Sequence, residues 1–227
     1  MIEKYQVILL CAGKGERMGL PLNKIFCEIE EGKKVIDYSL KLFNEDYRCD
    51  KIVVVYNVND KEILFDVLEE YKSNKIETAL GGSLRQDSVL KGLSLITSDY
   101  VLVHDVARPN INLELVNNVL DGFDKYDSVS LGVKVSDTIK KISSNLTTVD
   151  RDNLYYMQTP QGAKTCVLKE ALEMVSKKGI VVTDDLQAIE YLHKYNIGIV
   201  PGKKSNIKLT TLEDLQLIKF YMERKDV

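Results

Sequence analysis

The chain has 227 residues and a formal net charge of −3, with 44% hydrophobic and 29% charged residues. This balance is typical of a globular protein, and the slight acidity argues against a broad nucleic-acid-binding face. The first apolar run, residues 7–12, is too short for a membrane span or for the core of a signal peptide. The four cysteines form no Cys-x-x-Cys pair and no cluster with the two histidines. The sequence therefore predicts neither a disulfide framework nor a protein metal site, and it favours a cytoplasmic location.

Apolar runs alternate with helical stripes from residue 5 to residue 133. The runs predict buried strands at residues 5–11, 51–56, 76–80, 100–104 and 128–133. Between them, apolar residues at helical spacing predict helices at residues 35–43, 61–71, 87–96 and 113–123. This alternation is typical of a Rossmann-like α/β fold, a predominantly parallel sheet with helices on both faces. Because no low-complexity segment or Pro/Gly-rich linker interrupts the chain, we expect one domain over residues 1–227.

The pattern changes at Ser136. Residues 137–142 and 146–151 flank the turn sequence Ser143-Ser144-Asn145 and predict a polar β-hairpin. The hairpin has too few apolar side chains for a core of its own, so we expect residues 136–158 to project from the domain as an arm.

The last third of the chain returns to helices and short strands. The pattern predicts helices at residues 164–177 and 184–193 and short strands at residues 197–200 and 208–209. A last helix is predicted to begin near Thr211, with Thr210 and Glu213 as a capping box.

The loop after the first strand reads Ala12-Gly13-Lys14-Gly15-Glu16-Arg17-Met18. It is not a dinucleotide fingerprint, because Met18 stands where the third glycine belongs. Nor is it a phosphate loop of the Walker type, which needs a Lys-Ser/Thr pair after its last glycine. The ligand of this basic loop must therefore be inferred from the residues around it.

Ligands of open α/β sheets bind beyond the carboxyl ends of the strands, and this chain places several cations and one acid there. They are Arg17, Lys24, Arg85, Arg108, Lys208 and the carboxylate Asp105. Cations with exposed backbone N–H groups suit a polyphosphate, and a single acid among them suits Mg²⁺ or a substrate hydroxyl. The sequence therefore predicts phosphoryl or nucleotidyl transfer rather than a hydrolytic triad.

Motifs along roughly residues 5–220 carry a family resemblance. They occupy residues 12–18, 81–82 with 85–89, 104–109, 137–140, 150–151, 158–161, 183–185 and 206–210. In this order they resemble the 2-C-methyl-D-erythritol 4-phosphate cytidylyltransferases, which transfer CMP from CTP to that sugar-alcohol phosphate in non-mevalonate isoprenoid biosynthesis. The resemblance implies a nucleotidyltransferase fold, Mg²⁺ or another divalent cation on the CTP phosphates near Asp105, and a homodimer joined through the arm. It implies no nucleic-acid or membrane partner.

The resemblance also implies roles for individual residues. The catalytic residues, which would hold the CTP phosphates, are Arg17, Lys24 and Lys208. The nucleotide-binding residues are Cys11, Ala12, Gly13, Gly15, Gly81, Gly82 and Ser88. The sugar-phosphate-binding residues are Asp105, Arg108, Thr138, Arg151, Thr159 and Thr183, with Arg151 reaching the site of the partner subunit. The family commonly has Pro-Lys-Gln where this chain has Asn23-Lys24-Ile25.

Two other functions remain open from the sequence. A ribitol 5-phosphate cytidylyltransferase of teichoic acid synthesis belongs to the same family, but that group carries a Ser-Val pair where this chain has Val106-Ala107. A nucleotide-binding module without catalysis is the other alternative. The joint presence of Arg17, Lys24, Asp105 and Lys208 argues against it.

Overall fold

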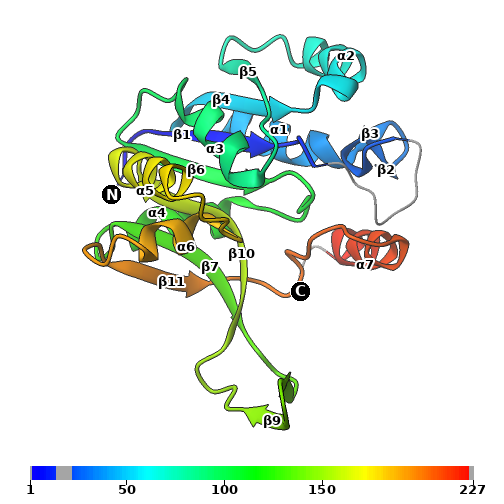
Figure 1. Cartoon of the computed structure of the whole chain (residues 1–227). Coiled ribbons are helices and arrows are strands. Elements are labelled where there is room, and N and C mark those ends of the chain that lie inside the picture. The colour runs from blue at the N-terminus through cyan, green and yellow to red at the C-terminus, as the bar shows by residue number, and fades with distance from the viewer. Residues whose placement is uncertain (1, 14–21, 225–227) are drawn as a thin grey trace.

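A computed structural model of the chain describes residues 2–13 and 22–224. Its centre is a seven-stranded sheet with the order β11-β7-β10-β6-β1-β4-β5 (Figure 1). The strands are β1 (Tyr5–Leu10), β4 (Cys49–Tyr56), β5 (Ile76–Leu80), β6 (Tyr100–Asp105), β7 (Ser128–Lys134), β10 (Tyr155–Lys164) and β11 (Ile197–Pro201). Within this sheet β10 runs antiparallel to its neighbours β6 and β7, and the other neighbouring pairs are parallel. The prediction of a predominantly parallel sheet is confirmed.

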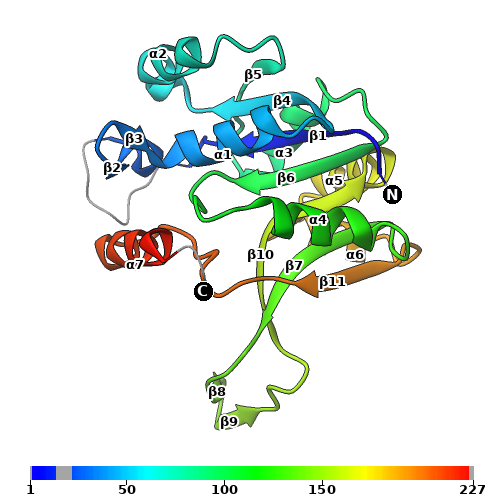
Figure 2. The ribbon, with the colours of Figure 1, turned by 180° about the vertical axis from the view of Figure 1, so that it is seen from behind.

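Helices cover both faces of the sheet. They are α1 (Val35–Glu45), α2 (Lys61–Tyr71), α3 (Arg85–Leu93), α4 (Leu113–Gly122), α5 (Thr165–Lys177), α6 (Asp185–Glu190) and α7 (Leu212–Glu223). Helices α3, α5 and α6 lie in front of the sheet in Figure 1, whereas α1 and α4 lie in front in the opposite view of Figure 2. Within the described residues, no helix combines the length and the apolar composition that crossing a membrane would require.

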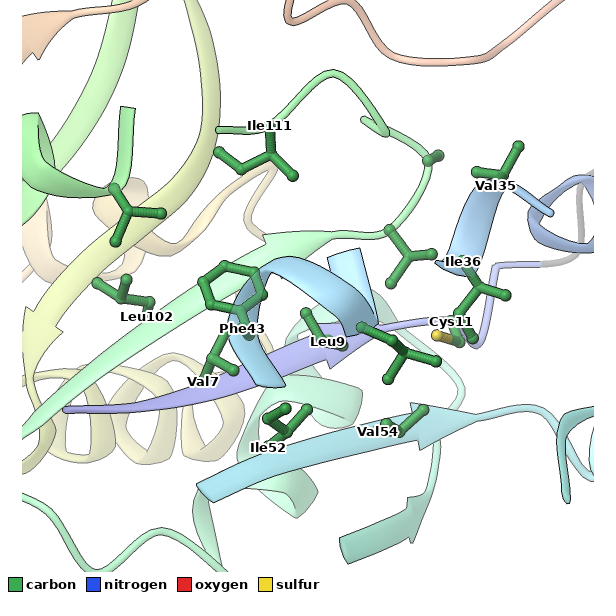
Figure 3. Close-up of a cluster of buried hydrophobic side chains, with 14 of the residues drawn as sticks. Val7, Leu9, Cys11, Val35, Ile36, Phe43, Ile52, Val54, Leu102 and Ile111 are labelled. Atoms are coloured by element: carbon green, nitrogen blue, oxygen red, sulfur yellow. The ribbon is translucent and has the colours of Figure 1, made fainter. Parts of the chain in front are cut away.

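The alternation of side chains along β1 explains why both faces are covered. Val7 and Leu9 belong to one buried cluster, with α1 and α4, whereas Ile8 belongs to a second cluster, with α3 and α5. Figure 3 shows the first cluster, in which Phe43 of α1 lies close to Val7. Successive residues of a strand point to opposite faces, so a continuously apolar strand must be buried on both. Each such side chain contributes about 1.5–3 kcal/mol when fully buried.

Strand β10 is absent from the sequence prediction. Its residues, YYMQTPQGAK, include a proline, a glycine and several polar side chains, which do not read as a strand at the centre of a sheet. The polar side chains are buried because they have partners. The amide nitrogen of Gln161 donates to Ser130 Oγ at 3.1 Å and to Asp184 Oδ2 at 3.0 Å. The short strands β2 (Glu28–Glu30) and β3 (Lys33–Lys34), which pair with each other, were also not predicted.

Several predicted boundaries are wrong by one or more residues. Helix α3 begins at Arg85 rather than at residue 87, because the Asp87 carboxylate accepts from the Leu84 N–H at 3.1 Å and so lies within the first turn. The last capping box consists of Thr211 and Asp214, one residue later than predicted. Helix α6 ends at Glu190, and residues 206–210 form no strand.

The predicted hairpin is present beyond β7 and β10. Strands β8 (Ile139–Ile142) and β9 (Leu146–Val149) form a separate two-stranded sheet. Figure 1 shows this pair at the far end of an extension that leaves the main sheet. Two apolar side chains of the hairpin face solvent in the single chain: Ile142 is 82% exposed and Leu146 is 64% exposed.

Candidate functional site

A cavity of about 750 Å³ lies at the carboxyl ends of β1, β4, β5 and β6. Its lining includes residues 10–13 after β1, Asn57 after β4, residues 82–85 after β5, and Asp105 at the end of β6. The short 3-10 helix η2 (Lys24–Phe26) and residues 208 and 210 complete it. This is the edge of the sheet at which the sequence predicts a ligand.

Most of the predicted residues that the structure describes meet in or directly below this cavity. The lining contains Cys11, Ala12, Gly13, Lys24, Gly82, Ser88, Asp105 and Lys208. Gly81 adjoins Gly82, and Arg108 and Thr159 lie just below the lining. Thr138, Arg151 and Thr183 are exposed and do not line the cavity of their own chain. Arg17 and Gly15 lie outside the described residues.

The two glycines after β5 permit a close approach between strand ends. A Cβ on Gly81 would lie 2.6 Å from the Cβ of Ala12, and a Cβ on Gly82 would lie 2.3 Å from the Cβ of Asp87. The Gly82 N–H donates to Ser88 Oγ at 3.0 Å. A larger side chain at Gly81 would therefore push the end of β5 away from Ala12, and one at Gly82 would collide with Asp87 in the first turn of α3.

Asp105 is the acidic centre of the site. Its Oδ2 accepts from Lys208 Nζ at 2.6 Å, and its Oδ1 lies 3.5 Å from Arg85 Nε. Burial by itself raises the pKa of this carboxyl, but Arg85 and Lys208 outweigh burial and hold the pKa well below its usual range. Asp105 therefore stays ionised at neutral pH, where it can bind a cation or accept a hydrogen bond from a substrate hydroxyl.

Arg85, one of the cations predicted at this edge, forms an ion pair with a second carboxylate, that of Asp185. Its two terminal nitrogens donate to the oxygens of Asp185 at 2.9 and 2.7 Å. Asp185 is 2% exposed and belongs to the first turn of α6. Bidentate pairs of this kind have a well-defined geometry, so Arg85, which also lines the cavity, links Asp105 to α6.

Below the cavity, Thr159 and Arg108 join β6 to β10 and to the segment 206–210. The Asp105 N–H donates to Thr159 Oγ1 at 3.0 Å, and the same oxygen lies 3.1 Å from His104 Nδ1. Burial lowers the pKa of His104 to about 3, so its ring is neutral at pH 7. Arg108 donates to the carbonyl oxygens of Asn206 at 2.7 Å and Met157 at 3.3 Å.

Lys24, the first residue of η2, also lines the cavity. Its Nζ donates to the carbonyl oxygen of Leu209 at 2.7 Å, which places its charge beside the segment that carries Lys208. Leu209 is itself held by its N–H, which donates to the carbonyl oxygen of Ala107 at 2.7 Å. Two lysines that are distant in sequence thus lie on one side of the cavity, which suits a ligand with several negative charges.

Sequence reasoning missed three residues of this arrangement: Asn23, Asp60 and Asp185. Asp185 belongs to the motif at residues 183–185, but the sequence does not indicate its partner. Asn23 stands where the family commonly has proline, which by itself predicts no hydrogen bonds. Asp60 carries no signal in the sequence, because only the fold brings it to Asn23.

Comparison with known proteins identifies the family of the chain. The family model for 2-C-methyl-D-erythritol 4-phosphate cytidylyltransferase (IspD) matches residues 5–224. A relative of that name from Lachnoclostridium phytofermentans is 39% identical over 221 residues, 94% of each chain. Another, from Bacillus mycoides, is 35% identical over 222 residues, 96% of this chain and 97% of that protein.

Solved structures agree as well. A crystal structure of 4-diphosphocytidyl-2C-methyl-D-erythritol synthase from Anaerococcus prevotii superimposes with a TM-score of 0.86 and 29% identity. The match covers 98% of this chain and 97% of that one. The chain belongs to the 2-C-methyl-D-erythritol 4-phosphate cytidylyltransferase family.

Proposed function

We propose that this protein transfers the CMP moiety of CTP to 2-C-methyl-D-erythritol 4-phosphate, a step of non-mevalonate isoprenoid biosynthesis. The observation that carries the proposal is the convergence of Lys24, Lys208 and Asp105 on one cavity in a chain of this family. In the reaction, a phosphate oxygen of the sugar-alcohol phosphate attacks the α-phosphorus of CTP. The bond from that phosphorus to the bridging oxygen breaks, and pyrophosphate leaves with the bonding electrons. The products are 4-(cytidine 5'-diphospho)-2-C-methyl-D-erythritol and pyrophosphate.

The lysines supply electrostatic catalysis. Both reactants are anions that repel each other, and negative charge accumulates on the oxygens of the α-phosphate in the transition state. Lys24 and Lys208, together with Arg17 from the loop after β1, would position these oxygens and stabilise their charge. The attacking phosphate oxygen is already ionised at neutral pH, so no general base is required. The neutral, buried His104 agrees with this scheme.

A divalent cation fits the site as a companion of CTP. The described residues contain no group of three or more His, Cys, Asp or Glu side chains that could hold a metal by themselves. Mg²⁺ is usually bound through one or two carboxylates together with substrate phosphates. Asp105 is ionised and lines the cavity, and it is the residue that would contact the cation. When bound, Mg²⁺ would neutralise the CTP phosphates and hold them in register.

The nucleotide and the sugar-alcohol phosphate would occupy adjacent parts of the cavity. Backbone and small side chains at Cys11, Ala12, Gly13, Gly15, Gly81, Gly82 and Ser88 would bind the nucleotide. Asp105, Arg108 and Thr159 at the end of β6, with Thr183 near α6, would bind the sugar-alcohol phosphate.

The arm suggests a homodimer. Thr138 and Arg151 lie on the exposed hairpin, away from the cavity of their own chain, and the apolar side chains of Ile142 and Leu146 are available to a second copy. A two-fold dimer would bring each arm to the partner and Arg151 to the partner's sugar phosphate. We place the protein in the cytoplasm, where its four free thiols would stay reduced, with no nucleic-acid or membrane partner.

The test is pyrophosphate release from CTP with a panel of sugar-alcohol phosphates, in the presence of Mg²⁺. We expect release with 2-C-methyl-D-erythritol 4-phosphate and little with ribitol 5-phosphate. A preference for ribitol 5-phosphate would assign the protein to teichoic acid synthesis. Binding of CTP without release from any acceptor would identify a non-catalytic nucleotide-binding module.

A further inference from the structure

Asn23 is a buried polar residue directly before Lys24, and it is 7% exposed. Its side-chain amide nitrogen donates to the carbonyl oxygen of Gly13 at 2.8 Å and to that of Cys11 at 3.1 Å. The same nitrogen donates to Asp60 Oδ2 at 2.8 Å. One amide group therefore joins the segment directly after β1 to the start of α2.

The geometry of Asp60 supports a specific role for this contact. Asp60 is the N-cap residue of α2, yet its side chain makes no capping hydrogen bond with its own helix. Its carboxylate instead accepts from Asn23. Since an amide nitrogen has two hydrogens, the two contacts at 2.8 Å can both be direct, and the longer contact with Cys11 shares one of those hydrogens.

The other end of the Asn23 side chain organises Lys24. Asn23 Oδ1 accepts from the Ile25 N–H at 3.4 Å, and the Asn23 carbonyl oxygen accepts from the Phe26 N–H at 2.9 Å. Asn23 thus caps η2, the single turn on which Lys24 lies. The backbone of Lys24 is held on this side, while its Nζ is held by the carbonyl oxygen of Leu209.

We propose that Asn23 is a positioning residue for Lys24, and that its amide fixes Lys24 by joining Gly13 to Asp60. This proposal rests on the proposed function, in which Lys24 stabilises charge on the α-phosphate of CTP. An error of about 1 Å in the position of a catalytic contact can reduce the rate by about 10²-fold.

The main test compares Asn23→Ala with wild type in steady-state kinetics. The substitution removes the tether, by which we mean the hydrogen bonds from the Asn23 amide to Gly13 and Asp60. Its loss should lower kcat by about 10- to 100-fold while the KM for CTP changes by less than about threefold, because Lys24 acts most strongly in the transition state. In a Lys24→Ala background the same substitution should have almost no further effect, since the two residues act through one contact. An unchanged kcat, or a full additional loss in the Lys24→Ala background, would overturn the proposal.

The matched control is Asn112→Ala. Asn112 also caps a helix, α4, through its Oδ1, which accepts from the Leu115 N–H at 3.0 Å, but it does not line the cavity. This control should lose thermal stability without losing kcat. If Asn23→Ala does not fold, Asp60→Ala removes one acceptor of the tether and should lower kcat in the same direction. Asp60→Asn, which keeps an acceptor oxygen, should retain more activity than Asp60→Ala, and the reverse order would overturn the proposal.

Hydrogen exchange separates this proposal from the proposed function. In Asn23→Ala, backbone amides of residues 25–27 should exchange faster than in wild type, whereas those of α4 should not change. Unchanged exchange at residues 25–27 would overturn the tether whatever the kinetics. Wild-type protein that releases no pyrophosphate would overturn the proposed function, and faster exchange in the variant would still support the tether.

Discussion

Lys208 and Asp105 are 103 positions apart in the sequence, yet Lys208 Nζ lies 2.6 Å from Asp105 Oδ2. Asp105 is the last residue of the central strand β6. Lys208 lies in the segment without regular structure between β11 and α7, and this segment returns to the end of β6. The pair brings the last part of the chain to the cavity, and Arg85 joins the other oxygen of Asp105 to α6 through Asp185. The ion pairs of Asp105 therefore set the charge of the cavity and also contribute to the stability of the fold.

The first prediction concerns stability in acid. Because the folded protein holds the pKa of Asp105 below its usual range, the carboxylate stabilises the fold above the unfolded-state pKa of about 3.9. That stabilisation is lost as the pH falls through the lowered folded-state pKa. We expect Asp105→Asn to reduce the free energy of unfolding at pH 7 by about 1.5–3 kcal/mol, the range for hydrogen bonds to charged groups.

Denaturant titrations of wild type and Asp105→Asn between pH 7 and pH 2 measure this effect. The difference between the two proteins should be constant near neutrality and should shrink below pH of about 4. A difference that grows as the pH falls would contradict the depressed pKa.

The second prediction concerns Lys24. If Lys24 stabilises charge on the α-phosphate, its charge is needed most when the α-phosphorus is pentacoordinate, so Lys24→Ala should reduce kcat more than it weakens CTP binding. The loss of one preorganised electrostatic contact corresponds to a fall of about 10²–10³ in kcat. Calorimetric titration with CTP and pyrophosphate-release kinetics measure the two quantities separately. Normal turnover in the Lys24→Ala variant would mean that η2 has a structural role only. Arg17→Ala is expected to behave like Lys24→Ala.

The third prediction concerns the choice of nucleotide. Cytosine presents an amino donor where uracil presents a carbonyl acceptor, and backbone at Cys11, Ala12 and Gly82 lines the cavity. A slot that accepts a hydrogen bond from the amino group would leave the uracil carbonyl without a donor. Each unsatisfied group weakens the binding free energy by about 1–3 kcal/mol. We expect kcat/KM for CTP to exceed that for UTP by about tenfold or more, and purine nucleotides to be poorer still because of their size. Equal rates with CTP and UTP would rule out the cytosine slot.

The fourth prediction concerns the arm. If Arg151 completes the partner's site, then Arg151→Ala and Lys24→Ala, each nearly inactive alone, should complement each other when mixed. Some mixed dimers would contain one site with both side chains intact, so part of the activity should return. Arginine suits this role because its guanidinium can donate two parallel hydrogen bonds to a phosphate.

Mass spectrometry of intact dimers should confirm that subunits exchange in this mixture. Mixing each variant with itself is the matched control and should restore nothing. No recovery after confirmed exchange would place Arg151 in the site of its own chain and remove the crossed-arm arrangement.

Much of the sheet could be predicted from the sequence alone. Strands β1, β4 and β6 contain the apolar runs 7–10, 52–56 and 100–103, and only burial on both faces accommodates such runs. The edge that carries the cavity could be predicted as well, because the carboxyl ends of parallel strands meet there and are followed by residues such as Gly82 and Asp105. The family resemblance rests on short motifs, which can be recognised from neighbouring residues in the sequence without the tertiary structure.

Tertiary structure decided what depends on partners distant in the chain. Strand β10 has a polar sequence, and it lies in the centre of the sheet only because side chains such as Gln161 find hydrogen-bond partners on other elements. From the sequence, Arg85 is one cation among several at the edge of the sheet, yet the fold pairs it with the buried Asp185. Asn23 and Asp60 meet only when η2 and α2 pack beside the end of β1. Hydrophobic periodicity is a local property of the sequence, whereas the charge and hydrogen-bond partners of a buried polar group are set by whichever elements the fold brings against it.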